Sequence, residues 1–189
     1  MSPELTPSQT VGPFFHDALL AEDRSELVRP DHPRAVRIEG TVYDGAGEPV
    51  PDAMVEIWQA DGAGRYDDPT VDHEVPPLDP ETFSGFGRSG TDADGRFSFV
   101  TVKPGPVPDP EGSPQAPHVM VSVFARGLHK RLVTRIYFPD EKDANSSDPV
   151  LSTLEDPKLR DSLIARKDTG VLRFDVHLQG ENQTAFFEL

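Results

Sequence analysis

Histidine, tyrosine and arginine side chains are the groups in this sequence that could bind a metal ion or a charged substrate. The histidines are spread out, with no two within five residues of each other. They are His16, His32, His73, His118, His129 and His177. Metal-binding histidines often come as close pairs, because one strand or one helical turn can then present both to the ion. Histidine spacing alone therefore favours surface or packed histidines over a metal site.

Four residues have both a functional and a structural interpretation. His118 follows Ala116-Pro117 and opens an apolar stretch, which makes it the strongest histidine candidate for chemistry. Tyr66 could donate a phenolate oxygen to a metal or simply lie in a loop. Arg126 could bind an anion through its fork of donors, or pair with one of the 33 acidic residues. Trp58, the sole tryptophan, could line a site, but its place on an expected strand favours the core.

The charge balance and the cysteine count exclude several kinds of function. With 18 basic and 33 acidic residues, the net charge of −15 disfavours nucleic acid and anionic membranes as partners. The absence of cysteine excludes disulfides, thiolate metal sites and thiol catalysis, and it fits a reducing compartment. We expect neither a secretory signal nor a membrane span, because no long apolar run is present. These observations predict a cytoplasmic protein.

Short strands separated by turns dominate the middle of the chain. Apolar and polar residues alternate over 36–43 and again over 53–59, and the turn residues at 44–47 between them predict a hairpin. Seven or eight such strands, with 20 prolines and 15 glycines along the chain, favour an all-β fold, an antiparallel β-sandwich. Two further pairs are predicted, 87–90 with 96–100 and 119–124 with 131–138.

The remaining segments suggest one domain preceded by an arm. We expect an N-terminal arm over 1–30 and a β-sandwich over 31–189, because no linker or repeat divides the chain. One helix is predicted after Asp156-Pro157, where a capping residue precedes a first-turn proline, and we expect at most two short helices. The segments 66–86 and 103–118 are long for loops, which is typical of functional or partner-bound segments.

Short stretches in order along nearly the whole chain form a further pattern. They are Thr6–Phe15, Gly40–Asp44, Val55–Asp61, Gly64–Tyr66, Phe86–Arg88, Thr101–Gly105, Ala116–His118, Ser122–Gly127, Thr134–Phe138 and Phe174–Glu181. This pattern resembles the intradiol ring-cleavage dioxygenases, and within them the α-type chains that assemble with a homologous β chain. The resemblance implies the β-sandwich fold of that family.

The resemblance also implies a ferric ion held by two tyrosines and two histidines, a donor set that suits Fe(III). The first tyrosine position is Tyr66, but the second, after Lys-Pro-Gly-Pro, is Val107. The two histidine positions of the pattern fall at residues 118 and 120, which are His118 and Met120. Valine cannot coordinate a metal, and a thioether is too soft for ferric iron. We therefore expect that this chain binds no catalytic iron, and that the Fe(III) of the complex is held by the partner β chain.

In the α/β members of the family, the α arm and one strand-end arginine line the substrate side of the pocket. The matching positions here are Thr10, Gly12, Pro13, Phe14 and Arg126. Arg126 could bind the carboxylate of protocatechuate, and Gly12 would let the backbone approach the ring. The resemblance thus implies a subunit of an enzyme that uses O₂ to cleave protocatechuate to 3-carboxy-cis,cis-muconate, in aromatic catabolism by the β-ketoadipate pathway.

Three alternatives remain open at this point. The chain could be a self-sufficient dioxygenase that borrows other iron ligands, such as His16 or His73. It could be a β-sandwich binding module, because its turn motifs are also common in domains that only present surfaces. It could also be a purely structural scaffold for a β chain that supplies every atom of the pocket.

Overall fold

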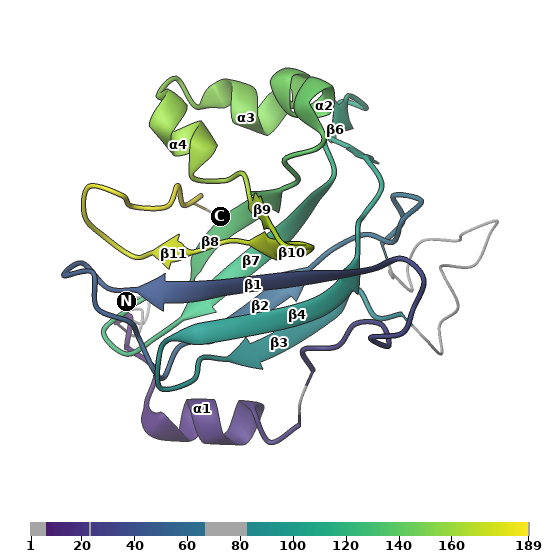
Figure 1. The fold of residues 1–189 in the computed structure, drawn as a ribbon. Coiled ribbons are helices and arrows are strands. Elements are labelled where there is room, and N and C mark those ends of the chain that lie inside the picture. Colours follow the sequence, from purple (N-terminus) through teal and green to yellow (C-terminus); the bar gives the residue numbers. More distant parts are fainter. Residues whose placement is uncertain (1–6, 23, 67–82, 189) are drawn as a thin grey trace, which may run out of the picture.

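Two β-sheets face each other in the computed structural model, which describes residues 7–22, 24–66 and 83–188 (Figure 1). In the first sheet, the central strand β1 pairs antiparallel with β4 on one side and parallel with β10 and β11 on the other. Strand β9 extends the sheet by pairing with β10. The bounds are β1 Ala35–Tyr43, β4 Arg96–Val102, β9 Arg166–Asp168, β10 Val171–Arg173 and β11 Val176–His177.

The second sheet is fully antiparallel, in the order β3-β2-β7-β8. A small separate hairpin, β5 with β6, precedes β7 in the chain. The bounds are β2 Met54–Trp58, β3 Phe86–Gly90, β5 Val107–Pro108, β6 Pro114–Gln115, β7 His118–Phe124 and β8 Leu132–Tyr137. The predicted all-β sandwich is confirmed, with the difference that the sheet around β1 is mixed rather than purely antiparallel.

Two of the three predicted strand pairs are wrong. Strands β1 and β2 lie in different sheets, and so do β3 and β4, although turn residues separate the members of each pair. A turn reverses the chain, but it does not decide whether the next strand returns to the same sheet or crosses to the other. The third pair, β7 with β8, is confirmed as a hairpin of neighbouring antiparallel strands.

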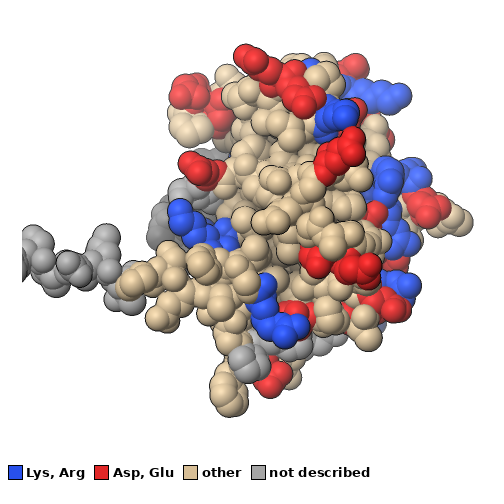
Figure 2. All heavy atoms as spheres, turned by 90° about the vertical axis from the view of Figure 1, so that its left-hand side faces the viewer, with Lys and Arg blue, Asp and Glu red and all other residues tan. Residues whose placement is uncertain are grey.

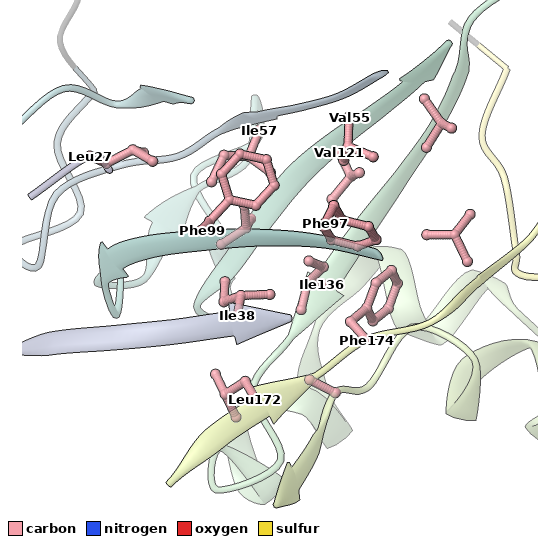
Figure 3. Close-up of a cluster of buried hydrophobic side chains, with 14 of the residues drawn as sticks. Leu27, Ile38, Val55, Ile57, Phe97, Phe99, Val121, Ile136, Leu172 and Phe174 are labelled. Carbon is pink, nitrogen blue, oxygen red and sulfur yellow. The ribbon is translucent and has the colours of Figure 1, made fainter. Parts of the chain in front are cut away.

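Apolar side chains from the two sheets interdigitate to form the core (Figure 3). On β4, Phe97 and Phe99 both point inward because residues two apart share one face of a strand, and their ring centroids are 6.1 Å apart. Ile38 and Ile57 meet them from β1 and β2 and are almost fully buried. Burial of such side chains contributes roughly 1.5–3 kcal/mol each, so this alternating pattern stabilises the sandwich.

The end of the expected arm joins the two sheets along one edge. Backbone bonds link Arg24 to Arg88 on β3, and Ser25 and Leu27 to Val100 on β4. Leu27 and Val28 are buried in the core. The last residues of the segment expected as an arm therefore close the sandwich edge, where an exposed strand would otherwise offer unpaired backbone groups.

Four short helices occur in the part of the chain that the structure describes. They are α1 Pro13–Leu19, α2 Lys142–Ser147, α3 Pro149–Thr153 and α4 Pro157–Asp161. The predicted helix is α4, and the Asp156 carboxylate caps it by accepting from the Lys158 amide at 2.9 Å. The other three were not predicted, because helices of five to seven residues are too short to show a 3.6-residue period and the Asp-Pro signal of α3, at Asp148-Pro149, lies in a segment interpreted as a solvated loop. None of these helices has the length and hydrophobicity needed to span a bilayer.

We predict that Gly40→Ala lowers the free energy of unfolding by about 3 kcal/mol, because the sandwich leaves no space for a side chain there. A Cβ at Gly40 would lie 1.8 Å from the Phe174 carbonyl oxygen and 2.6 Å from the Phe97 ring. Urea denaturation followed by far-UV circular dichroism measures the change. Gly12→Ala is the matched control, since a Cβ there meets nothing within 4 Å. Equal stability of the two variants would contradict the prediction.

Candidate functional site

The N-terminal arm meets the turn between β7 and β8, next to Arg126. The Gly127 amide donates a hydrogen bond of 2.8 Å to the Thr10 hydroxyl oxygen. Further along the arm, the Phe15 ring packs against Phe124 at the end of β7, with centroids 5.4 Å apart. The structure thus brings Thr10 and Arg126, which are distant in the sequence, into one neighbourhood.

The other residues expected to line a pocket follow Thr10 directly. Gly12 is exposed, Pro13 is the first residue of α1, and the Phe14 side chain is 84% exposed. The Arg126 side chain is 69% exposed and pairs with the Asp52 carboxylate. Figure 2 views the end of the molecule from which the arm extends, and uncharged side chains cover much of its centre. Thr10, Gly12, Phe14 and Arg126 are exposed, and together with Pro13, which lies between Gly12 and Phe14 in the chain, we call them the arm region.

The positions that match the family's iron ligands lie close together in another part of the fold. The Gly105 amide donates to the Asp61 carbonyl at 2.9 Å, so the turn before Tyr66 packs against the segment that leads to Val107. Strand β6 then leads into β7, which carries His118 and Met120. We call Tyr66, Val107, His118 and Met120 the degenerate site.

Trp58 borders the degenerate site instead of filling the core. Its ring stacks on Tyr66 at a centroid distance of 6.1 Å and an interplanar angle of 7°. Trp58 is the register partner of Met120 on the neighbouring strand. The tryptophan is 39% exposed, so the expectation of a core residue is wrong. On β2 it shares a face with Glu56, whereas Val55 and Ile57 on the opposite face point into the core.

Arg135 on β8 lies beside the degenerate site, and sequence reasoning gave it no role. It is the register partner of Met120. Its Nη1 atom donates to the Gln115 side-chain oxygen at 2.8 Å and to the Tyr137 hydroxyl at 3.2 Å. Burial raises the pKa of Tyr66, and the Arg135 charge acts in the opposite direction. The Thr-Arg-Ile-Tyr-Phe stretch marked this segment as part of the family pattern, but nothing in the sequence placed Arg135 next to Tyr66.

The buried carboxylate of Asp148 holds together the segments around the degenerate site. Asp148 is fully buried and accepts the Tyr137 hydroxyl at 3.0 Å and the Ala116 amide at 2.8 Å. It also caps α3 by accepting the Val150 and Leu151 amides, each at 2.9 Å. In the sequence, Asp148 ends a run of acidic and small polar residues that is typical of a solvated loop. Only the fold shows that it is the hub of a buried network.

Comparisons with known proteins agree with this architecture. The family model described as "Dioxygenase" matches residues 10–180. The protocatechuate 3,4-dioxygenase α chain of Pseudomonas putida is 41% identical, covering 97% of this chain and 96% of that one. The β chain from Burkholderia cepacia is 35% identical, covering 96% of this chain and 72% of its own. The dioxygenase domain of a carbohydrate-binding fusion protein from Streptomyces sp. SirexAA-E superposes with a TM-score of 0.57 at 26% identity, covering 95% and 98% of the two chains.

This chain belongs to the intradiol dioxygenase family. Intradiol dioxygenases are iron enzymes, but the degenerate site of this member does not fit the ferric ion. Val107 is buried and has no donor atom, and Met120 offers only a soft thioether. His118 is almost fully buried, and its Nδ1 lies 2.8 Å from the Ala116 carbonyl oxygen. Tyr66 and His118 together would leave a ferric ion with half of the four-residue donor set.

The alternative ligands considered for a self-sufficient dioxygenase do not complete the set in the described structure. His16 belongs to α1, and His73 lies outside the described residues. Within the described ranges, no three His, Cys, Asp or Glu side chains come together in a way that could hold a metal ion.

We predict that His118 makes the fold less stable as the pH falls. Burial, assisted by the Arg135 charge, lowers the pKa of His118 from 6.5 to about 4. The unfolded chain therefore binds a proton on this histidine at a pH where the folded chain does not, and stability is lost as the pH falls from 6.5 toward 4. This effect costs about 2 kcal/mol between about pH 7 and about pH 5.

Urea denaturation at the two pH values, compared between wild type and His118→Gln, isolates this effect from the titration of carboxylates. The variant is expected to show a flatter pH dependence, whereas His129→Gln, at an exposed position, keeps the wild-type dependence. A slope that His118→Gln leaves unaltered would show that His118 is not the group responsible.

Proposed function

We propose that this chain is the iron-free α subunit of a heteromeric protocatechuate 3,4-dioxygenase, and that its arm region forms one wall of an active site whose iron belongs to a β chain. The observation that carries the proposal is the contrast between the two regions. The degenerate site has lost two of its four ligands at Val107 and Met120, while the arm remains fixed beside Arg126 by the Thr10–Gly127 hydrogen bond. The identity to an α chain over almost its full length supports this assignment.

The β-chain partner is supported by the arm region itself. Residues 7–12 lie along the surface, and the adjacent Phe14 presents almost its whole ring to solvent. Burial of an exposed aromatic ring at an interface contributes more than that of most side chains, and aromatic residues are enriched there. We therefore infer that the arm predicted over residues 1–30 contacts the β chain through the part that precedes Arg24, because from Arg24 to Val28 it closes the edge of the sandwich. The absence of cysteine agrees with the reducing cytoplasm.

Arg126 is the group proposed to bind the substrate carboxylate. Its pair with Asp52 is largely exposed, and such pairs contribute only about 0–1 kcal/mol. A charge-assisted hydrogen bond to a substrate carboxylate in a closed interface contributes about 1.5–3 kcal/mol. Because the guanidinium has five N–H donors, it can turn toward the substrate without abandoning Asp52 completely. Gly12 has open space next to its Cα, where the aromatic ring of the substrate could lie.

The chemistry divides between the chains. The iron of the β chain, when bound, supplies the activation of the substrate hydroxyls toward O₂. Arg126 binds the substrate carboxylate, at the end of the substrate opposite the hydroxyls, and so sets the direction in which the two hydroxyls point. Thr10 keeps the arm against the β7–β8 turn and so holds Gly12 and Pro13 in place. Docking of this face against the β chain excludes water and strengthens the Arg126 contact.

We predict that the full chain purified alone contains no iron and has no dioxygenase activity. Co-expression with a homologous chain that carries two tyrosine and two histidine ligands is expected to give a stable complex. The iron content of that complex should equal the amount of the second chain, with none bound by this one. Metal analysis and visible absorption of phenolate bound to iron provide the measurement. An iron-loaded, active preparation of this chain by itself would overturn the assignment and favour a self-sufficient dioxygenase.

We predict that Arg126→Ala in the complex raises KM for protocatechuate about tenfold to a hundredfold, because a charge-assisted hydrogen bond is lost. The rate with catechol, which lacks the carboxylate, is expected to stay the same. Arg131→Ala is the matched control, since it removes an exposed arginine a few residues away. Thr10→Val, which removes the hydroxyl that accepts from Gly127, should raise KM to a smaller extent.

Steady-state kinetics on the four complexes separate the candidate roles. An unchanged KM for protocatechuate in Arg126→Ala, with assembly intact, would show that this chain is a scaffold and that the β chain supplies every pocket atom.

A further inference from the structure

Arg135 differs from the other half-buried arginines in the described part of the chain. Arg65, Arg88 and Arg173 each form an ion pair with a carboxylate. Arg135 pairs with none among the described residues, and both of its hydrogen bonds go to neutral oxygens through Nη1. The buried Asp148 carboxylate reaches Arg135 only through the Tyr137 hydroxyl, so Arg135 remains a half-buried charge with N–H donors that no described carboxylate occupies. Such a charge is a natural partner for an anion from outside the chain.

Aromatic rings lie near this charge. The Trp58 and Tyr66 rings are stacked nearly parallel, and Trp58 and Arg135 flank Met120 from the two strands on either side of it. On another side, the Arg135 guanidinium carbon lies 6.0 Å from the centre of the Phe187 ring. Trp58 is 39% exposed and Arg135 is half-buried, so solvent reaches both side chains. A flat apolar ligand could contact these rings while its acidic group reached the guanidinium.

We propose that Arg135 and the stacked Trp58–Tyr66 pair form a second binding site, for the carboxylate of a small aromatic acid. The Nε and Nη2 atoms of Arg135 have no hydrogen-bond partner among the described residues. Two adjacent guanidinium N–H groups match the two oxygens of a carboxylate in a bidentate pair. Gln115 and Tyr137 hold Nη1, which orients the fork and reduces the entropy lost on binding.

This site is separate from the arm region. Arg135 lies opposite Met120, and Arg126 follows Met120 by six residues. At a rise of about 3.3 Å per residue, the two arginines are up to about 20 Å apart along the strand, farther than one small aromatic acid extends. The inference is independent of the proposed function, because binding at Arg135 requires neither the β chain nor turnover.

The fluorescence of Trp58, the sole tryptophan, reports on this site directly. We expect benzoate, titrated into the full chain, to change the emission in a saturable way, and added salt to weaken the effect. Benzamide has the same shape without the charge, and we expect it to bind about tenfold more weakly or not at all. Identical responses to benzoate and benzamide, or no saturable response, would overturn the proposal.

Variants assign the binding to one arginine. Arg135→Gln should weaken benzoate binding about tenfold or more, whereas Arg131→Gln should retain it. Arg135→Lys keeps the charge without the fork, so it should bind with intermediate affinity, and it serves as the test if the glutamine variant does not fold. Thermal denaturation of each variant accompanies the titration. Reduced stability of Arg135→Gln with unaltered benzoate affinity would show that Arg135 has only a structural role.

Discussion

The buried carboxylate of Asp148 is the interaction on which the geometry of the degenerate site depends. Removal of a carboxylate from water is costly unless several donors surround it, and Asp148 accepts four hydrogen bonds. These bonds join three segments, namely the start of α3, the end of β8 and the residue two before His118. Because the Tyr137 hydroxyl donates to Asp148, its oxygen is oriented to accept from Arg135. The position of Arg135 is therefore set by a residue that never contacts it.

This network explains how the family fold persists without the family's metal ligands. In iron-bearing members, the bond energy of a trivalent ion holds tyrosines and histidines from different segments together. Here the corresponding segments are held by Asp148 and by the stacking of Trp58 on Tyr66. The Arg135 charge, which acts on both Tyr66 and His118, would also repel any cation placed between them.

The sequence predicted local features well and long-range ones poorly. The β7–β8 hairpin follows from two apolar runs with a short link, and α4 follows from its cap and proline. The pairing of β1 with β4 was not predictable in the same way, because the ten residues between β1 and β2 permit a crossing to the other sheet. Trp58 was expected in the core because it is a tryptophan on a strand, although it lies on the face opposite Val55 and Ile57 and is exposed.

In the candidate site, too, residues marked by local motifs were predicted and residues defined by long-range contacts were not. The resemblance to a family located Tyr66, Val107, His118 and Met120, since three short motifs mark these four positions. Asp148 and Arg135 have no such motif, and their roles depend on partners such as Ala116 and Gln115 that lie 20 or more residues away. The residue type of an aspartate does not show whether its carboxylate is buried or exposed. The difference in free energy between them arises only from the donors that the fold brings together.

Arg126 and Arg135 illustrate how the environment, rather than the residue type, determines function. Both are arginines in a chain of net charge −15, whose overall field disfavours the approach of an anion. Salt screens that field beyond about 8–10 Å, so a bound carboxylate responds mainly to the nearest charges. Arg126 has Asp52 beside it and is exposed, and it therefore needs a closing partner to bind an anion strongly. Arg135 forms no ion pair with a described carboxylate, is linked to Asp148 only through the Tyr137 hydroxyl and is half-buried, so its remaining N–H donors are available to an anion in the isolated chain.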